Sequence, residues 1–437
     1  MTWLPFACAL AAAAGTEPAP ISVDACVAIA MQRSARVQMA EADVAMFRAQ
    51  TDQVKALLSP QVSVLTYGAP LFGAEGGLGL AGGYRSDFHR WGPYVHGEAK
   101  VIVPITTFGR LSAGVAAAEG RAAVEAERAR ETSHAVRLEV RRLFGLRLYA
   151  LSLKPALENG RTILKEAIQK AEEMYAKGSG EVTLPDVMRL QYGAGEIARF
   201  LRQADDGIEL AGRALKQAMG LPEDDPTLFE GDRLPLPGDA QPLEDLVSEA
   251  RRNRPEFAEV RLGRAAAASW ESAESKAHLP VLFAAAAGQF DRSPVRPTGT
   301  SAVFYNGYND QFAGAVVGLS LDWNFARARS KAAEARSRSA WIDAAARLAE
   351  TGIPLQVRKA HSDWKQHADL ARIADQEVKD TRKWLAFSAA AYMAGTGEAK
   401  EVLEGVGANL LAKKAYYDHL LGAWAARAEL EQATGRP

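Results

Sequence analysis

The sequence contains one unit twice. Residues 23–222 and residues 243–437 are diverged copies of each other, and their alignment needs only a few short insertions. Three pairs of segments carry the clearest match: 23–60 with 243–280, 175–178 with 392–395, and 215–222 with 430–437. Repeats of about 20–50 residues form solenoids, whereas a repeat of this length is a duplicated domain. The chain is therefore predicted to build one architecture twice.

The charge balance excludes one large class of function. The 437 residues include 52 basic and 53 acidic side chains, so the net charge is about -1. A protein that binds nucleic acid needs a basic excess to contact phosphates, so we expect no nucleic-acid partner. Long stretches rich in Ala, Leu, Glu and Arg indicate long helices instead.

The N-terminal segment has the pattern of a targeting signal. Residues 4–14 resemble the apolar core of a secretory signal, and residues 12–14 offer small side chains for cleavage. Beyond this segment no run of about 18 apolar residues without charge occurs, so a helical membrane anchor is not expected. The predicted organisation is a signal peptide with a short lead (1–21), a first repeat (22–220), a linker (221–242) and a second repeat (243–437).

Each repeat is predicted to hold the same order of elements: helix, strand, loop, strand, very long helix, tight turn, helix. The predicted helices are about 23–58, 110–177 and 186–219 in the first repeat, and 243–279, 326–394 and 401–433 in the second. In each repeat the two short helices together match the long one in length. A layer of helices about 100 Å long follows, at about 1.5 Å per residue. A spacer or a conduit needs that length, whereas a globular domain does not.

The strands alternate between apolar and polar residues. Residues 94–105 and 312–323 place aliphatic side chains on one face and polar ones on the other, with 61–67 and 281–290 as weaker partners. The strand pairs are thus predicted at about 61–106 and 281–323. Strands of this length and pattern fit a transmembrane β-barrel, and aromatic residues near their ends fit an interfacial girdle. A small soluble sheet with aromatic core residues is the alternative explanation.

Four strands in one chain cannot close a membrane barrel. The smallest membrane barrels have about eight strands, and an open edge is not tolerated in lipid. We therefore expect the strands to be shared, with three chains giving twelve strands around an open lumen. The predicted fold class is mainly α with β, a duplicated helix–hairpin–helix unit whose strands join a trimeric barrel continued by long helices.

Three segments now carry a resemblance to a known family. Residues 392–404 (Tyr-Met-Ala-Gly-Thr-Gly-Glu-Ala-Lys-Glu-Val-Leu-Glu), 428–435 and 104–110 resemble the helical turn, the closing helix and the strand-to-helix junction of the TolC family of outer-membrane efflux channels. The resemblance covers nearly all of residues 22–437. It implies a homotrimer in outer-membrane lipid, with a twelve-stranded barrel and a periplasmic α-helical barrel. It also implies a periplasmic adaptor and an inner-membrane transporter as partners, no catalysis and no cofactor.

The resemblance also assigns a pore constriction. By residue match, Glu401 and Glu404 occupy the positions of an acidic ring, which would favour cations. Tyr392 and Asp186 match positions that link neighbouring coiled coils in the closed state. The alternative for the two glutamates is that acidic residues in a first helical turn simply favour the helix dipole. The sequence departs from the family pattern at Gly397, where an arginine is usual, and Pro185 stands beside Asp186 in a longer turn.

The two helical turns of each chain are the expected docking surface for the adaptor. The residues of these tips are Gly178, Ser179, Gly180, Gly395, Thr396 and Gly397. The alternative explanation, which is compatible with docking, is that glycine only supplies the backbone freedom of a tight turn.

A metal site and an enzyme are not expected. Asp363 and His367 have helical i, i+4 spacing that can bind metal, but the sequence offers no matching third ligand. No set of residues that could form a catalytic triad or a phosphate-binding loop is present. The remaining rival to a channel is a soluble coiled-coil scaffold without channel activity. The strand pairs with aromatic ends argue against it, because a scaffold does not need them.

Overall fold

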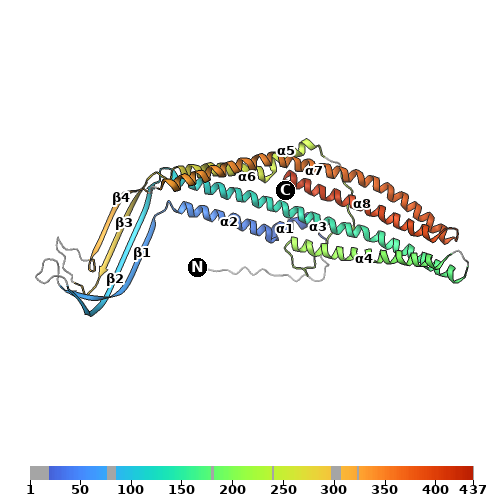
Figure 1. Ribbon diagram of the computed structural model, residues 1–437, viewed down its shortest axis with the longest axis horizontal. Helices are drawn as coiled ribbons and strands as arrows, with labels where there is room; N and C mark the ends of the chain where they lie inside the picture. The colour runs from blue at the N-terminus through green and yellow to red at the C-terminus, as the bar shows by residue number, and fades with distance from the viewer. Residues whose placement is uncertain are drawn as a thin grey trace. The chain divides into compact units, whose positions relative to one another are not determined.

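The computed structural model describes residues 19–75, 85–178, 182–238, 241–296, 307–321 and 324–436. Both halves of the chain contain helix, helix, strand, strand, helix and helix in that order (Figure 1). The elements are α1 (Val23–Arg33), α2 (Ala35–Ala56), β1 (Gln61–Glu75), β2 (Arg85–Thr106), α3 (Arg110–Ala176), α4 (Leu184–Ala218), α5 (Leu243–Asn253), α6 (Pro255–Ser275), β3 (Val281–Arg292), β4 (Gln311–Ser320), α7 (Phe325–Met393) and α8 (Ala399–Thr434).

The chain divides into two compact units. The helical unit comprises Met1–Ala42, Glu127–Phe257 and Leu348–Pro437. The strand unit comprises Asp43–Ala126 and Ala258–Arg347, and it contains all four strands.

The first helix of each half is broken, which corrects the predicted single helices over 23–58 and 243–279. The breaks fall at Ser34, between α1 and α2, and at Arg254, between α5 and α6. Both residues have extended backbone. Pro255 explains the second break, because proline lacks a backbone N–H and disfavours a helical conformation in the residue before it. No proline marks the first break.

Two glycines allow other parts of the chain to pack closely against the two helix breaks. Gly220 and Gly435 follow the last helix of their repeats, and both have positive φ, at 69° and 70°. A Cβ on Gly220 would lie 2.2 Å from the carbonyl oxygen of Arg33, and one on Gly435 would lie 2.8 Å from the carbonyl carbon of Asn253. The end of each repeat therefore packs directly on the backbone of its own helix break.

The helical unit has three clusters of buried side chains. The first, beside the two helical turns, joins α3, α4, α7 and α8 through residues that include Leu164, Leu190, Tyr392 and Val402. The second joins α1, α2, α3, α4, α7 and α8, and the third joins α5, α7 and α8. Burying one such leucine adds about 1.5–3 kcal/mol to the free energy of unfolding, so these three clusters stabilise the packing of the helices. The long helices α3 and α7 continue through Pro155 and Pro354, inside the predicted spans.

The linker between the repeats is bound to the helical unit. Ile21 forms an isolated parallel bridge with Phe229, and the N–H of Leu234 donates to Ser152 Oγ over 3.0 Å. The side chain of Leu234 is buried in the second cluster.

The strand unit holds one antiparallel sheet of four strands in the order β1-β2-β3-β4. Val101 is the partner of Val62 on one side and of Ala286 on the other. β1 and β2 are longer than predicted because they pair with each other beyond the end of β3, with a register shift between Phe72 and Gly73. β1 and β4 each pair with one strand only, so the described sheet has two open edges.

No helix in the described part of the chain is both long and apolar enough to cross a membrane.

Candidate functional site

The turn between α3 and α4 is shaped by one glycine and one carboxylate. Gly178 has a φ of 68°, which glycine adopts without strain. Asp186 Oδ2 accepts hydrogen bonds from the Thr183 backbone N–H at 3.1 Å and from the Thr183 hydroxyl at 2.5 Å. These bonds keep the pKa of Asp186 below its usual range, and they cap the first turn of α4. The predicted tip residues Ser179 and Gly180 lie outside the described residues.

The turn between α7 and α8 is tighter. Gly395 has a φ of 80°, and the N–H groups of Thr396 and Gly397 both donate to the carbonyl oxygen of Ala391. A Cβ on Gly397 would lie 2.9 Å from the backbone nitrogen of Tyr392. In this chain the turn therefore folds back on the end of α7 so closely that it leaves no room for a side chain at position 397.

Tyr392 and Asp186 lie within electrostatic range, but no hydrogen bond joins them. Tyr392 is 1% exposed, and its hydroxyl has no hydrogen-bond partner among the described residues. Burial raises the pKa of Tyr392, and the charge of Asp186 adds to the effect. The carboxylate of Asp186 is already engaged by Thr183. In one chain the two residues thus interact electrostatically without a hydrogen bond, and Tyr392 belongs to the first buried cluster whereas Asp186 does not.

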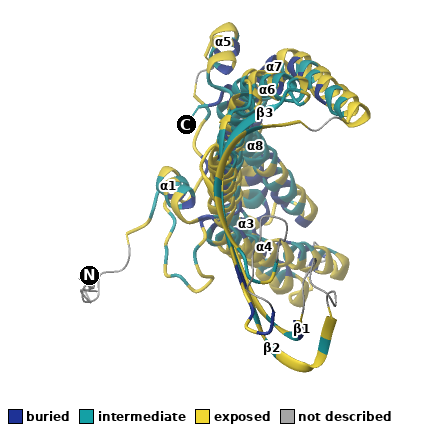
Figure 2. Ribbon diagram, turned by 90° about the vertical axis from the view of Figure 1, so that its left-hand side faces the viewer, coloured by how far each residue is buried: buried dark blue, intermediate teal, exposed yellow. Residues whose placement is uncertain are grey.

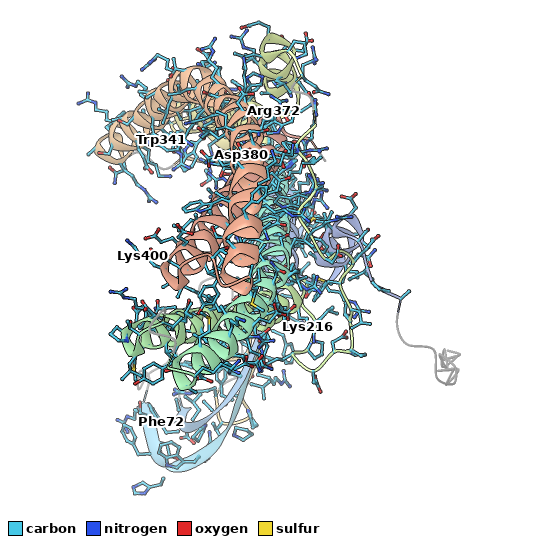
Figure 3. The ribbon with its side chains drawn as sticks, turned by 90° about the vertical axis from the view of Figure 1, so that its right-hand side faces the viewer. Phe72, Lys216, Trp341, Arg372, Asp380 and Lys400 are labelled. Carbon is cyan, nitrogen blue, oxygen red and sulfur yellow. The ribbon has the colours of Figure 1, made fainter. Side chains whose placement is uncertain are left out.

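Glu401 and Glu404 lie in the first turns of α8 and face away from the buried cluster. Both are exposed, whereas Val402 on the opposite side of the helix is 1% exposed. Glu404 Oε1 lies 3.7 Å from Lys400 Nζ, and the Lys400 side chain projects outward from α8 (Figure 3). The two carboxylates can therefore contact groups outside the protomer.

One face of the sheet is apolar and uncovered. Neighbouring positions across the strands share a face, and the register puts Val62, Val101, Ala286 and Ala315 in one row. On that face Val64 is 71% exposed and Val317 is 69% exposed, and Figure 2 shows β1 and β2 largely exposed. The residues of this apolar face include Val62, Val64, Val95, Val101, Val103, Leu282, Ala284, Ala286, Val317 and Leu319.

The opposite face carries a buried polar cluster. Asp291 on β3 is 2% exposed. Its carboxylate contacts His96 Nδ1 at 2.7 Å, and it accepts hydrogen bonds from Tyr94 Oη and Gln289 Nε2, both at 2.5 Å. The cluster joins β2 to β3. The sequence assigned His96 to the polar face, but Asp291 was not singled out. Gln289 and Asp291 are two residues apart on β3 and share a face. This polar spacing is the feature of the sequence that could have pointed to Asp291.

A folded segment covers the far end of the β1–β2 hairpin. The carbonyl oxygen of Val295 accepts from the Ala74 N–H at 3.1 Å and from Arg90 Nη2 at 3.3 Å. The guanidinium of Arg296 lies 4.8 Å from the ring centre of Phe72 and 4.6 Å from that of Tyr308. Charge on an aromatic face is attractive, so this contact holds Arg296 and Tyr308 against the hairpin.

No group of three or more His, Cys, Asp or Glu side chains that could hold a metal ion occurs among the residues that the structure describes.

The comparison with family models matches a little less than half of the chain, all of it in the second repeat. Residues 246–436 match the family "Outer membrane efflux protein". This range covers almost all of the second repeat and includes Tyr392, Glu401 and Glu404 at the second helical turn. No curated protein matches the chain.

Solved structures match nearly the whole chain. A membrane protein from Pseudomonas aeruginosa aligns with a TM-score of 0.77 at 17% identity, over 94% of this chain and 93% of its own. The outer membrane protein VceC from Vibrio cholerae aligns with a TM-score of 0.75 at 16% identity, over 94% and 96%. The CmeC outer membrane channel from Campylobacter jejuni gives 0.77 at 14% identity, over 94% and 85%. At these identities the likeness establishes the fold.

Proposed function

We propose that this chain, whose residues 246–436 match the outer membrane efflux protein family and whose fold is that of solved outer-membrane channels, acts as a homotrimeric exit duct. The family match supports a role as the outer-membrane channel component of a tripartite efflux system. The trimer, its partners and its pore residues are the parts that we propose for this chain.

The apolar face of the sheet is the observation that carries the proposal. One face of the sheet carries a row of aliphatic side chains across all four strands, whereas the opposite face mixes polar residues such as Lys100 with apolar ones such as Leu65 and Val316. A continuous aliphatic face fits contact with lipid. A soluble scaffold would have to leave this patch in water, which soluble monomers rarely do. This observation favours the channel over the coiled-coil scaffold.

The open edges of the sheet support a trimer. β1 and β4 are the two edge strands, and they run antiparallel to each other because every pair in the sheet is antiparallel. β4 of one copy can therefore pair with β1 of the next and continue the same ladder. Unpaired backbone groups are not tolerated in lipid. Three copies with four strands each close a ring of twelve.

The helical unit also carries surfaces for neighbouring copies. Apolar side chains are exposed on α4 and on α7: Met188 is 56% exposed, Tyr192 is 70% exposed and Phe387 is 76% exposed. In a trimer these helices would meet helices of adjacent copies, which would remove the apolar side chains from water. The interface is proposed on this basis.

The two helical turns are proposed to dock a periplasmic adaptor, and the adaptor in turn would dock an inner-membrane transporter. The pore constriction is proposed at Glu401 and Glu404, since both carboxylates point out of the protomer at the second turn. Tyr392 and Asp186 are proposed to hold the closed state. Their electrostatic interaction without a hydrogen bond supports a weak tie that opening can break at low cost.

Recording from planar lipid bilayers tests the proposed function. Purified protein should insert and give stable, discrete conductance steps, with a preference for cations if the carboxylates line the bore. Heat-denatured protein at the same concentration is the control. A membrane-inserted protein without such steps would contradict the channel function.

A further inference from the structure

Two histidines that are far apart in the sequence lie together in the helical unit. His367 on α7 and His419 on α8 place their Nδ1 atoms 3.4 Å apart, with ring centres separated by 5.6 Å and planes inclined at 42°. Both side chains are half-buried. Sequence reasoning set aside the Asp363–His367 pair because no further ligand was in sight, and the fold supplies His419.

The separation suits a shared metal ion better than a hydrogen bond. Protein hydrogen bonds have their most frequent N···O distance at about 2.9–3.0 Å. Two nitrogens bound to one tetrahedral ion, with metal–nitrogen bonds of about 2.0–2.1 Å, are about 3.3–3.4 Å apart. The two Nδ1 atoms already have that spacing before any ion is bound.

Gly422 makes the arrangement possible. A Cβ at this position would lie 2.5 Å from both Nδ1 and Cε1 of His367. Only glycine at 422 lets the His367 ring lie against the backbone of α8, one turn from His419. The carboxylate of Asp363, one turn earlier on α7, acts electrostatically on His367, and its charge is shared with Lys359 Nζ, which lies 2.6 Å from Asp363 Oδ2.

We propose that His367 and His419 bind a divalent transition-metal ion such as Zn²⁺, Cu²⁺ or Ni²⁺ between α7 and α8. Imidazole nitrogen suits these ions. The described residues hold no group of three such ligands, so water completes the coordination, and the affinity is lower than that of a closed structural site. The bound ion joins α7 to α8 within one protomer. The inference is independent of the channel function.

Calorimetric titration with Zn²⁺ tests the proposal on the full protein, purified without a histidine tag. The wild type should bind one ion per protomer. His367→Ala and His419→Ala should each weaken binding at least about tenfold, since each leaves a single nitrogen ligand. Cu²⁺ bound to the wild type should show two nitrogen ligands by electron paramagnetic resonance, and either variant should lose one of them.

His361→Ala is the matched control, because His361 lies on the same helix and bonds only the carbonyl oxygen of Gln241 in the described structure. This variant should bind as the wild type does. Gly422→Ala is a second variant that keeps both ligands but displaces the His367 ring, and it should also weaken binding. Equal Zn²⁺ affinity in the wild type and the His367→Ala/His419→Ala double variant would overturn the proposal.

Discussion

At the scale of single residues, glycines decide where this chain can approach itself. Gly220, Gly397, Gly422 and Gly435 each stand where a Cβ would come within 3 Å of backbone or ring atoms. The sequence shows that these positions are glycine, but not which backbone they meet, because that contact depends on how distant helices pack. Only the two helical turns could be predicted from glycine alone.

His134 makes the helical unit sensitive to acid. It is 8% exposed, and burial, followed by the charges of Arg137, Arg130 and Arg254, lowers the pKa of His134 to about 4 from 6.5. Between these two values the unfolded chain holds a proton that the folded chain lacks. The contribution of His134 to stability is therefore complete above about pH 6.5 and falls by on the order of 3 kcal/mol as the pH approaches 4.

The variant His134→Gln should remove this part of the pH dependence. Its amide can still donate to the Arg436 carbonyl, and it does not titrate. Melting temperatures from circular dichroism at pH 7 and pH 4.5 should fall less for the variant than for the wild type. Glu131, whose pKa is raised by burial, is present in both proteins, so it cancels in the comparison. Equal acid shifts would contradict the role of His134.

A second prediction concerns the proposed pore residues Glu401 and Glu404. Replacing both with alanine removes two carboxylates from each of three copies, so single-channel conductance should rise and cation preference should fall. Asp206→Ala/Glu209→Ala is a matched control, since it removes the same charge from exposed positions of α4. If both double variants conduct alike, the two glutamates are not at the constriction.

At the scale of elements, helix type and order could be predicted, whereas the ends of some elements could not. The long helices were predicted within a residue or two of α3 and α7. The break at Ser34 was missed because it has no proline and is held by Gly220 instead. The break at Arg254 had a signal in Pro255. β1 and β2 were predicted too short, since their extension is stabilised by mutual pairing rather than by alternation.

The polar cluster of the sheet shows a similar limit. The alternation of polar and apolar residues in the sequence is enough to predict that His96 and Asp291 lie on polar faces of their strands. Their contact depends on the register of β2 against β3, which pairs these two residues directly. Register is fixed by the whole sheet, so the partner of a single polar residue could not be read from its own strand.

Neighbouring residues of β2 test which face meets lipid. Val101→Arg places a charge on the apolar face and should cost about 2–4 kcal/mol at mid-membrane depth, enough to reduce the assembled protein in the outer membrane. Ile102→Arg makes the same kind of change on the opposite face and should assemble normally. Immunoblots of outer-membrane fractions measure both. Equal assembly of the two variants would contradict the assignment of the faces.

At the scale of the whole molecule, the two repeats give a sheet that is complete within no single chain. Both of its edges are open, its apolar face is uncovered, and α4 and α7 carry exposed apolar side chains. The proposed assembly of three copies would cover all three kinds of surface. The strand count alone predicts such an assembly, because open sheet edges are not tolerated in lipid.

The mass of the protein in mild detergent, after extraction from outer-membrane fractions, tests this central claim most directly. Light scattering coupled to size-exclusion chromatography separates the protein mass from the detergent mass. The account predicts three copies of the chain in one particle, recovered from the outer membrane. A soluble monomer or dimer would contradict it, because the four strands would then close no barrel.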